Sequence, residues 1–571
     1  MALAPLWLVG IFGRGLWTPD EPREADIAWR MSLQGDRTLP HLAERPFLEK
    51  PPLTYWVAAA SIRAFGDFPA AVRAPQLAYA VIAALSLAAL SLAMQANLVA
   101  AVFTALVAMS ALIAFRVSAW LGPDACLFAA GALALAGAWR GYRAAPGRAK
   151  LRGYLLMHLG AAIGFMAKSA PGWLIPSLAL LALIAWERRW QELRRWELYV
   201  GFLLQALLIG PWLLAILQEP NAAATLQALF WHNLMGRFTR VAAPAALDYT
   251  SGHRNSPGKY LLELPVYLLP WTLIVAAALV RAWREARTGA AHATAWRFAL
   301  CSCVPFLVLL SLAATARDVY AAPAVLGFGM LAGLWAQAAQ QAPARLDRLA
   351  LRLSRYLVAL IAWAFAAAIL LFAAAGEARW ASGTLIALAI LAATHLALLC
   401  AAGAQRAGDL QRSLTWLYSG YTVAVCLMAL ALFPIFDRWQ DLPALARRIH
   451  ADTAHEPLAL LEPDETTIAM LDRGLSTRFT LLGATGDAPA NATASGRVAA
   501  WFRTQGPTAR VLVLLPGHAP GALTDWLARF LPPSPPGDGV AGELIRAGSA
   551  SLMQRYELPQ GRRYALLGPP P

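Results

Sequence analysis

Apolar segments close in length to the thickness of a bilayer recur along this chain, and they constrain its fold more than any other feature. They lie near residues 2–14, 72–94, 97–115, 124–139, 153–167, 171–186, 198–217, 260–280, 298–314, 319–337, 356–375, 383–403 and 414–434. A helix crosses a hydrocarbon core of about 30 Å with about 20 apolar residues, so the pattern predicts an all-α polytopic membrane domain of about 13 transmembrane helices. The first segment is too short to cross alone. Either the natural chain begins farther upstream, or this segment packs among other helices.

Composition and charge give the predicted bundle an orientation. The chain is 59% hydrophobic and only 14% charged, and its arginines gather in every second loop, near residues 140–152, 187–195, 281–287, 345–355 and 406–412. Basic loops stay on the cytoplasmic side of a membrane, so the net charge of +15 requires no nucleic-acid partner. The long loops 15–71 and 218–259 then lie on the external side, where we expect interfacial helices and any chemistry.

The last part of the chain has a different pattern. "PLALLEP" and "ARVLVLLPG" predict short buried strands, whereas "DETTIAMLDRGL" and "GALTDWLARFL" predict helices. Alternating strands and helices are typical of a small soluble α/β domain. We therefore divide the chain into a membrane domain over residues 1–434 and an external soluble domain over residues 435–571. Neither contains a nucleotide-binding glycine loop, so no nucleotide cofactor is expected.

The first external loop carries a high density of charge. Asp20 and Glu21 follow the first apolar segment directly, and Glu49 and Lys50 precede a Pro-Pro pair. "EADIAWRMS" predicts a short amphipathic helix in the interface plane, which Glu21 would cap. The polar side of this helix contains Arg23, Asp26 and Arg30. A solvated loop would explain that amphipathic pattern, but not four ionisable residues at a boundary where charge loses solvation, so we favour a functional site.

Lysine is rare in this chain. Only four of the 48 basic residues are lysines, namely Lys50, Lys150, Lys168 and Lys259. Lysine is a compact point charge and arginine is a planar fork, so a retained lysine indicates either chance or a site that requires the compact cation. Lys168 ends an apolar segment on the external side. It either snorkels to the interface or contacts a lipid headgroup.

The external motifs together resemble a known family. "GLWTPDEPREADIAWRM" followed by "GDRTLPHLAERPFLEKPPLTYW" resembles the first-loop signature of bacterial glycosyltransferases that use polyprenyl-phosphate sugars. These enzymes form part of the glycosyltransferase-C superfamily, and the protein O-mannosyltransferases are relatives. The most similar branch is that of the lipid A 4-amino-4-deoxy-L-arabinose transferases. Weaker similarities follow in "PD" at 123–124, "AKSAPGW" at 167–173, "HRNSPGKYLLELP" at 253–265 and "DVYAAP" at 318–323.

The resemblance implies roles for several residues. Lys50 and Arg237 would contact the polyprenyl phosphate, and Tyr320 would line the donor site. Interfacial anchoring is an alternative for both Arg237 and Tyr320. Asp20 would be the catalytic carboxylate, acting as a base on a hydroxyl acceptor or positioning groups for an acceptor that is already anionic. A separate set of candidates consists of Asp124 as a second acidic residue or a helix cap, Glu49 as a further acidic residue, and Arg23 as a third cation for the phosphate.

The resemblance also implies a divalent metal ion. A glutamate before the "KPP" lysine and a histidine from a later loop would hold zinc, which accepts such ligands. Glu49 is the glutamate here, and His232 and His253 are the competing histidines. Sequence spacing does not separate these two histidines.

The function implied is an inverting glycosyltransferase in the bacterial inner membrane, acting on the periplasmic face as a monomer surrounded by membrane lipids. It would move an aminoarabinose or another amino sugar, such as glucosamine, from undecaprenyl phosphate to lipid A phosphate. Added ammonium groups would offset negative charge and so weaken the binding of cationic peptides. Another envelope glycan or a protein is the alternative acceptor. A transporter is the alternative class, but transporters place ionisable residues near the midplane of paired repeats, and this pattern is absent from the sequence.

Overall fold

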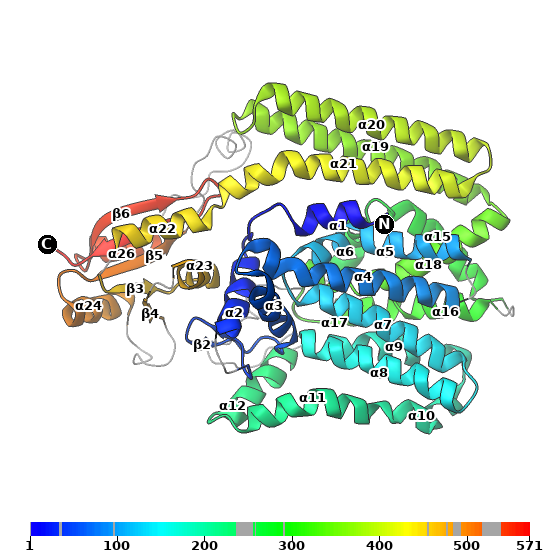
Figure 1. Cartoon of the computed structure of the whole chain (residues 1–571), viewed down its shortest axis with the longest axis horizontal. Coiled ribbons are helices and arrows are strands. Elements are labelled where there is room, and N and C mark those ends of the chain that lie inside the picture. Colours follow the sequence, from blue (N-terminus) through cyan, green and yellow to red (C-terminus); the bar gives the residue numbers. More distant parts are fainter. Residues whose placement is uncertain are drawn as a thin grey trace.

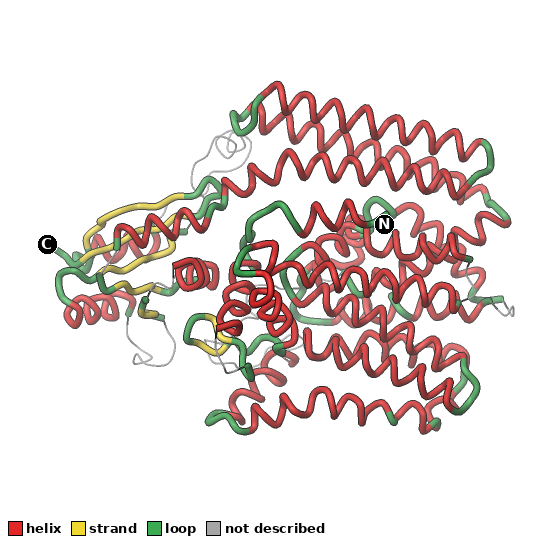
Figure 2. The backbone as a smooth tube through the Cα atoms, in the orientation of Figure 1, coloured by secondary structure: helices red, strands yellow, loops and turns green. Residues whose placement is uncertain are grey.

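The computed structural model describes residues 2–33, 37–94, 97–235, 255–256, 258–288, 292–453, 456–475, 478–483, 493–516 and 538–571. A bundle of helices forms the larger part of the molecule, and a small domain containing a sheet lies at one end of it (Figures 1 and 2). The described secondary structure therefore agrees with a helical domain followed by a small α/β domain. The chain enters the second domain where α21 (Leu410–Trp439) is followed by α22 (Leu442–Asp452).

The first half of the bundle combines short helices near its domain-facing end with longer ones behind them. Its elements are α1 (Ala4–Ile11), α2 (Glu21–Leu33), β1 (His41–Leu42), β2 (Arg45–Pro46), α3 (Leu53–Phe65), α4 (Pro69–Ala93), α5 (Leu98–Ser110), α6 (Leu112–Ala119), α7 (Pro123–Arg143), α8 (Arg148–Lys168) and α9 (Pro171–Glu187). The short segment at the start of the chain packs among other helices, because Leu6, Trp7 and Ile11 of α1 are buried.

The described part of the second half of the bundle contains one π-helix and two short 3-10 helices among α-helices. Its elements are η1 (Trp190–Arg194), α10 (Trp196–Tyr199), α11 (Gly201–Leu217), α12 (Ala222–Leu226), the π-helix η2 (Gln227–Met235), α14 (Lys259–Tyr267), α15 (Thr272–Glu285), α16 (Ala293–Cys301), α17 (Val304–Leu312), η4 (Asp318–Ala321), α18 (Ala324–Gln341), α19 (Arg345–Ala374) and α20 (Trp380–Arg406). Figure 1 shows α19, α20 and α21 side by side along one edge of the bundle.

Fewer helices meet the length and hydropathy of a membrane span than the sequence predicts. Among the described residues six do so, or up to eight if each of two bent pairs counts as one span. The bent pairs are α5 with α6, at 69°, and α14 with α15, at 117°. They coincide with the segments predicted near 97–115 and 260–280, and whether each pair crosses the membrane as one span stays a prediction. The two breaks meet, because the backbone N–H of Leu112 donates to the carbonyl of Leu269 over 2.8 Å. The total of 13 spans stays a prediction.

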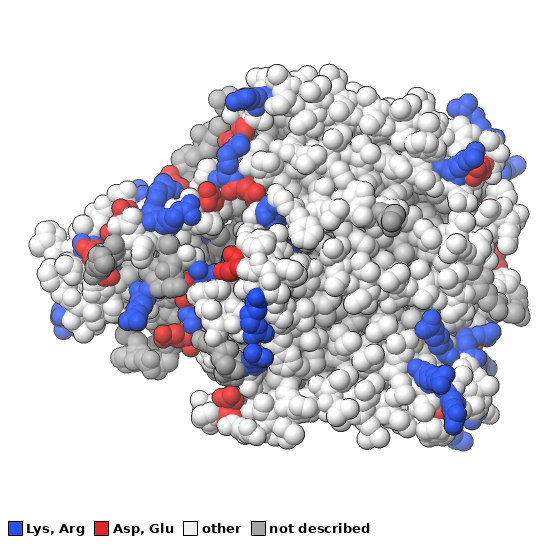
Figure 3. All heavy atoms as spheres, in the orientation of Figure 1, with Lys and Arg blue, Asp and Glu red and all other residues white. Residues whose placement is uncertain are grey.

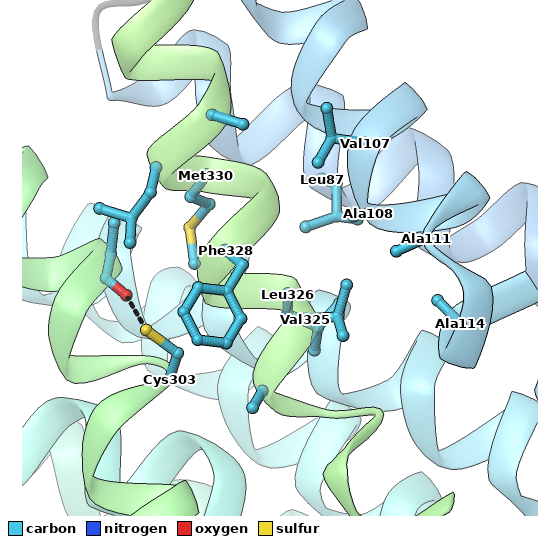
Figure 4. Close-up of a cluster of buried hydrophobic side chains, with 14 of the residues drawn as sticks. Leu87, Val107, Ala108, Ala111, Ala114, Cys303, Val325, Leu326, Phe328 and Met330 are labelled. Atoms are coloured by element: carbon cyan, nitrogen blue, oxygen red, sulfur yellow. Dashed lines mark hydrogen bonds between the residues drawn. The ribbon is translucent and has the colours of Figure 1, made fainter. Parts of the chain in front are cut away.

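Small residues let the central helices pack closely. Figure 4 shows part of this core, where side chains of α4, α5 and α18 meet, among them Leu87, Val107 and Phe328. A Cβ atom at Gly333 of α18 would lie 1.9 Å from Oγ1 of Thr104 on α5. Helices surrounded by lipid associate through such close packing rather than through a hydrophobic driving force.

The charged side chains visible on one face of the molecule are unevenly distributed (Figure 3). On the face in Figure 3, Lys, Arg, Asp and Glu gather at the two ends of the bundle, and a broad band between them lacks these residues. The end opposite the small domain is mainly basic on this face. Such a distribution is typical of a helical bundle that crosses a bilayer.

In the described residues of the C-terminal domain, five strands form a mixed sheet in the order β4-β3-β5-β7-β6. Its elements are β3 (Leu458–Leu461), α23 (Glu465–Leu475), β4 (Thr480–Leu482), α24 (Ala494–Gln505), β5 (Arg510–Leu515), α26 (Gly539–Arg546), β6 (Ser551–Glu557) and β7 (Arg563–Gly568). Strand β3 is parallel to β4 and β5, and β7 is antiparallel to both β5 and β6. The two strands and the first helix predicted here are confirmed as β3, β5 and α23. The helix predicted over residues 521–531 lies outside the described residues.

The helices of the first loop lie between the bundle and the C-terminal domain, where α23 packs on α2 (Figure 1). The sequence predicts α2 correctly, and the position of this helix in the interface plane stays a prediction. Its polar side is largely buried and not open to solvent. Arg23 and Asp26 are buried together with the apolar Ala25 and Ile27. The reason is that α23 covers the polar side of α2, so charged partners from the C-terminal domain replace water.

Candidate active site

A buried ion-pair network fixes the start of α2. The carboxylate of Glu21 accepts hydrogen bonds from Arg14, at 2.5 and 2.9 Å, and from Arg73 of α4, at 3.3 Å. It also accepts from the backbone N–H of Leu121 in the segment before α7, at 2.9 Å. All three charged side chains are almost fully buried. Glu21 therefore ties three separate segments together instead of capping α2, and it holds the neighbouring Asp20 in a fixed place.

A cavity of about 250 Å³ opens beside this network. Its charged lining is evenly balanced between acidic and basic side chains. The acidic residues are Asp20, Glu24, Glu49, Asp124 and Glu465, and the basic residues are Arg23, Lys50, Arg116, Lys168 and Arg317. They come from the first loop, from α6, α7 and α8, from the segment before η4, and from the C-terminal domain. Residues separated by more than 400 positions thus converge on one polar space.

An apolar groove of about 100 Å³ continues from this cavity. The two spaces share lining residues from five segments, namely Glu49, Lys50, Asp124, Lys168, Asn233, Thr315, Val319 and Tyr320. The rest of the groove is mostly hydrophobic, with Leu127, Leu174, Phe306, Leu309 and Leu310 among its lining residues. A molecule with a charged headgroup and an apolar chain could therefore place its headgroup in the cavity and its chain in the adjoining groove.

Arg23 and Glu24 form the centre of the charged cluster. The guanidinium of Arg23 donates to Glu24 at 2.8 Å, to Asp20 at 3.1 Å and also to Glu465. The same Oε1 atom of Glu24 accepts from Nζ of Lys50 at 2.7 Å. Glu24 thus bridges two cations and determines where the ammonium group of Lys50 points.

These contacts shift pKa values in opposite directions. Burial alone would raise the pKa of the Glu24 carboxyl, but Lys50 and Arg23 lower it to about 2, so Glu24 is ionised at neutral pH. Burial alone would lower the pKa of the Arg23 guanidinium, yet the carboxylates around it, with Glu465 the strongest, raise it well above its ordinary value. Arg23 and Glu24 are therefore both charged, with Arg23 held by carboxylates on several sides.

A second ion pair lies on the other side of the cavity. Nζ of Lys168, at the end of α8, donates to the carboxylate of Asp124 at the start of α7. The ammonium group also lies 4.9 Å from the ring centroid of Tyr320, close enough for a cation–π contact. Arg317 approaches Asp20 at 3.7 Å from the segment before η4. With Arg23 and Lys50 of the first loop and Arg116 of α6, cations from four separate segments therefore line the cavity.

The structure brings most of the predicted site residues together. Among the described residues, the predicted Asp20, Arg23, Glu49, Lys50, Asp124 and Tyr320 all line the cavity. Arg237 and His253 lie outside the described residues. His232 is described, on η2, but it is not part of the cavity lining. The catalytic and binding roles of these residues stay predictions.

The described residues do not test the predicted zinc site. Within the described ranges no group of three His, Cys, Asp or Glu side chains has the geometry to hold a metal ion. Glu49 lies in the cavity, 3.9 Å from the ammonium group of Lys50. Zinc bound by Glu49 and a histidine therefore stays a prediction.

Sequence reasoning missed several lining residues. Glu24 was assigned no role, although it lies one helical turn beyond Asp20, and this spacing is a usable signal. Arg317 directly precedes the "DVYAAP" motif at 318–323. Glu465 belongs to the C-terminal domain, and only the folded structure brings it to the cavity. Lys168, for which snorkelling was an open alternative, binds Asp124 inside the cavity.

This architecture is that of a polytopic helical protein with a polar cavity at one end of its bundle. The proteins that the chain resembles in sequence and in fold are glycosyltransferases. Residues 49–214 match the family model of dolichyl-phosphate-mannose-protein mannosyltransferases. The whole chain is similar in fold to the crystal structure of ArnT from Cupriavidus metallidurans bound to undecaprenyl phosphate, with a TM-score of 0.70 over 99% of this chain and 96% of that one, at 19% sequence identity. The apo structure of the same protein gives a TM-score of 0.67.

Two sequence relatives of this chain share the name of one enzyme. The undecaprenyl phosphate-alpha-4-amino-4-deoxy-L-arabinose arabinosyl transferase of Pseudomonas aeruginosa (strain UCBPP-PA14) is 30% identical over 334 residues, which cover 58% of each chain. The transferase 1 of that name from Pseudomonas fluorescens (strain Pf0-1) is 32% identical over 338 residues, 58% of this chain and 56% of its own. The chain thus spans little more than half the length of the curated relatives it matches. These similarities confirm the resemblance found in the sequence.

Proposed function

We propose that this protein is an inverting glycosyltransferase that takes an amino sugar from undecaprenyl phosphate and transfers it to a lipid A phosphate. The sequence relatives are named for an aminoarabinose donor of this kind. The structural relative was crystallised with undecaprenyl phosphate. We assign 4-amino-4-deoxy-L-arabinose as the sugar and keep another amino sugar, and another envelope acceptor, as outcomes of the test.

The observation that carries the proposal is the continuity of the charged cavity with the apolar groove. A polyprenyl phosphate has an anionic headgroup and a long apolar chain, and these two spaces offer each part its own surroundings. Lys50 and Lys168 occur in the lining of both spaces, so their ammonium groups lie where the headgroup meets the chain. A phosphate there would compete with Glu24 and Asp124 for these two cations.

The geometry supports the following chemistry. An oxygen of the acceptor phosphate attacks the anomeric carbon of the sugar, the bond from that carbon to the carrier phosphate breaks, and undecaprenyl phosphate leaves with the electron pair. Lys50 and Lys168 stabilise the charge that grows on the leaving phosphate. Asp20 is partly exposed in the cavity, and it orients the sugar or steadies positive charge at the anomeric carbon. The acceptor phosphate is already anionic, so no strong base is required.

The proposed orientation follows from charge. Basic residues predominate in every second loop, and the end of the bundle away from the C-terminal domain is mainly basic on the face in Figure 3. The positive-inside rule then puts the cavity and the C-terminal domain in the periplasm, with the bundle of about 13 spans in the inner membrane. Nucleotide sugars are made in the cytoplasm and are scarce in the periplasm. A cavity on the periplasmic side therefore requires a donor such as a lipid-linked sugar.

The test combines a cellular and a purified measurement. Mass spectrometry of lipid A from cells with and without the gene should show an added mass equal to one amino sugar. The purified protein, given the undecaprenyl-linked sugar and lipid A, should form the same product, and Asp20→Asn should abolish it. An unchanged lipid A mass together with no transfer in vitro would overturn the proposal, whereas an added mass of another sugar would correct the donor.

A further inference from the structure

The C-terminal domain contributes a side chain to the charged cavity. Glu465 is the first residue of α23, it lines the cavity, and its carboxylate binds Nη1 of Arg23. Its side chain keeps 35% of its exposure, so it faces the open space and not the interior of its own domain. A domain that follows the bundle in sequence therefore reaches the place where the proposed chemistry occurs.

A second ion pair repeats this contact without reaching the cavity. Arg30 of α2 binds Asp472 of α23 through two nitrogens. Arg23 and Arg30 are seven residues apart, as are Glu465 and Asp472, so each pair follows one face of its helix over two turns. Asp472 is not among the residues that line the cavity. Both pairs join an arginine of α2 to a carboxylate of α23, but Asp472 is more buried than Glu465, lies beside Asp26 and does not line the cavity.

Other contacts already dock α23 onto the bundle. The guanidinium of Arg473 donates to Asp67, just before α4, at 2.6 Å. The hydroxyl of Thr466 donates to the backbone carbonyl of Pro19, at 3.2 Å, directly before Asp20. Together with the Asp472 pair, these contacts hold the helix in place. Docking alone therefore gives no reason for a further charged group in the cavity.

Glu465 also bears an electrostatic cost. Burial raises the pKa of its carboxyl, and Arg23 counters this effect only in part, while Glu49 opposes ionisation further. Among the described contacts of Arg23, Glu465 holds Nη1, whereas Asp20 and Glu24 share Nη2. Removing Glu465 would free one side of the guanidinium to swing toward Glu24, and Glu24 is the residue that directs Lys50.

We propose that Glu465 is a positioning residue for sugar transfer, supplied by the C-terminal domain. It fixes the orientation of the Arg23 guanidinium, which fixes the Glu24 carboxylate and, through it, the ammonium group of Lys50. The inference rests on the proposed function, because it assigns Lys50 to the leaving phosphate. It adds that the C-terminal domain is part of the active site and does more than cover it.

The test compares two matched substitutions, Glu465→Gln and Asp472→Asn, in the full-length protein. Each removes one carboxylate charge from an arginine between the same two helices. Steady-state transfer from undecaprenyl-linked aminoarabinose to lipid A gives kcat and KM, and thermal unfolding gives Tm. We expect Glu465→Gln to lower kcat at least about tenfold, with the donor KM changed less than about twofold, because the headgroup is misaligned rather than unbound. Asp472→Asn should keep kcat within about twofold.

A conservative variant separates positioning from stability. Glu465→Asp keeps the charge but shortens the reach, so kcat should lie between those of the wild type and Glu465→Gln while Tm stays at the wild-type value. This variant also decides the matter if Glu465→Gln does not fold. Equal kcat for Glu465→Gln and Asp472→Asn, or a wild-type kcat for Glu465→Asp together with a lowered Tm, would overturn the positioning role and leave the proposed function intact. A wild-type protein that transfers no sugar would overturn both.

Discussion

Glu24→Gln removes the one negative charge that Arg23 and Lys50 share, and the structure gives the size of the effect. The Glu24 side chain is 3% exposed, and the pKa of its carboxyl falls from 4.5 to about 2 in the folded protein. This depression of the pKa corresponds to about 3 kcal/mol of preference for the ionised form. Glutamine keeps a hydrogen bond but not the charge, so we expect the free energy of unfolding to fall by about 2–3 kcal/mol.

The pH dependence of this loss has a definite sign. A carboxyl whose pKa is depressed by folding stabilises the protein above its unfolded pKa, and this stabilisation disappears as the pH falls through the folded pKa. The difference in Tm between wild type and Glu24→Gln should therefore be full at pH 7 and shrink as the pH falls from 4.5 toward about 2. Tryptophan fluorescence of the detergent-solubilised protein would measure both transitions.

A matched control is Glu192 of η1, which binds Lys150 near the start of α8. Glu192 accepts from Lys150 and, at 2.6 Å, from the hydroxyl of Tyr154, and it is as buried as Glu24. Glu192→Gln should lower Tm by a comparable amount and retain sugar transfer, whereas Glu24→Gln should also lose transfer because Lys50 is released. Identical Tm values for wild type and Glu24→Gln at pH 7, with no dependence on pH, would refute the ion-pair reasoning.

Three further changes give separate outcomes. Lys168→Met removes a cation from the cavity and should lower kcat/KM about 10- to 100-fold in the transfer assay, with Tm little changed. Leu310→Trp fills the apolar groove and should raise KM for the undecaprenyl donor at least tenfold while leaving a short-chain donor unaffected. Burial and the nearby Asp472 raise the pKa of the Asp26 carboxyl, so ionisation of Asp26 destabilises the fold as the pH rises. Asp26→Asn should therefore unfold at a higher temperature than wild type at pH 7, and this advantage should vanish in acid; a constant difference across pH would contradict that sign.

Much of the fold follows from local pattern, and its exceptions have a physical cause. Long apolar segments predict the helical bundle, and alternating short segments predict the α/β domain, because each pattern reports which side of an element is buried. Hydropathy is continuous through Ala111 and through the segment joining α14 to α15, so it cannot reveal the breaks there. Those breaks depend on a contact between two distant segments, at Leu112 and Leu269.

The candidate site also contains some residues that the sequence predicts and others that it does not. Asp20, Glu49 and Lys50 were predictable because charge at a membrane boundary is costly and so marks function. Burial of the polar side of α2 under α23 was not predicted, because a single sequence does not show which element will cover a helix. Arg23 and Arg30 have the same seven-residue spacing as Glu465 and Asp472. The sequence does not show that these residues pair, because the pairs form only when α23 packs on α2.

Binding of undecaprenyl phosphate to the purified protein tests the central claim most directly, since it requires neither sugar nor acceptor. Native mass spectrometry would compare wild type with Lys50→Met in the charged cavity, Leu310→Trp in the apolar groove, and Glu192→Gln as the control. We predict saturable binding to the wild type and the control, and affinity at least about tenfold weaker for the other two variants. Equal affinity in all four proteins would contradict a carrier lipid held across the cavity and the groove.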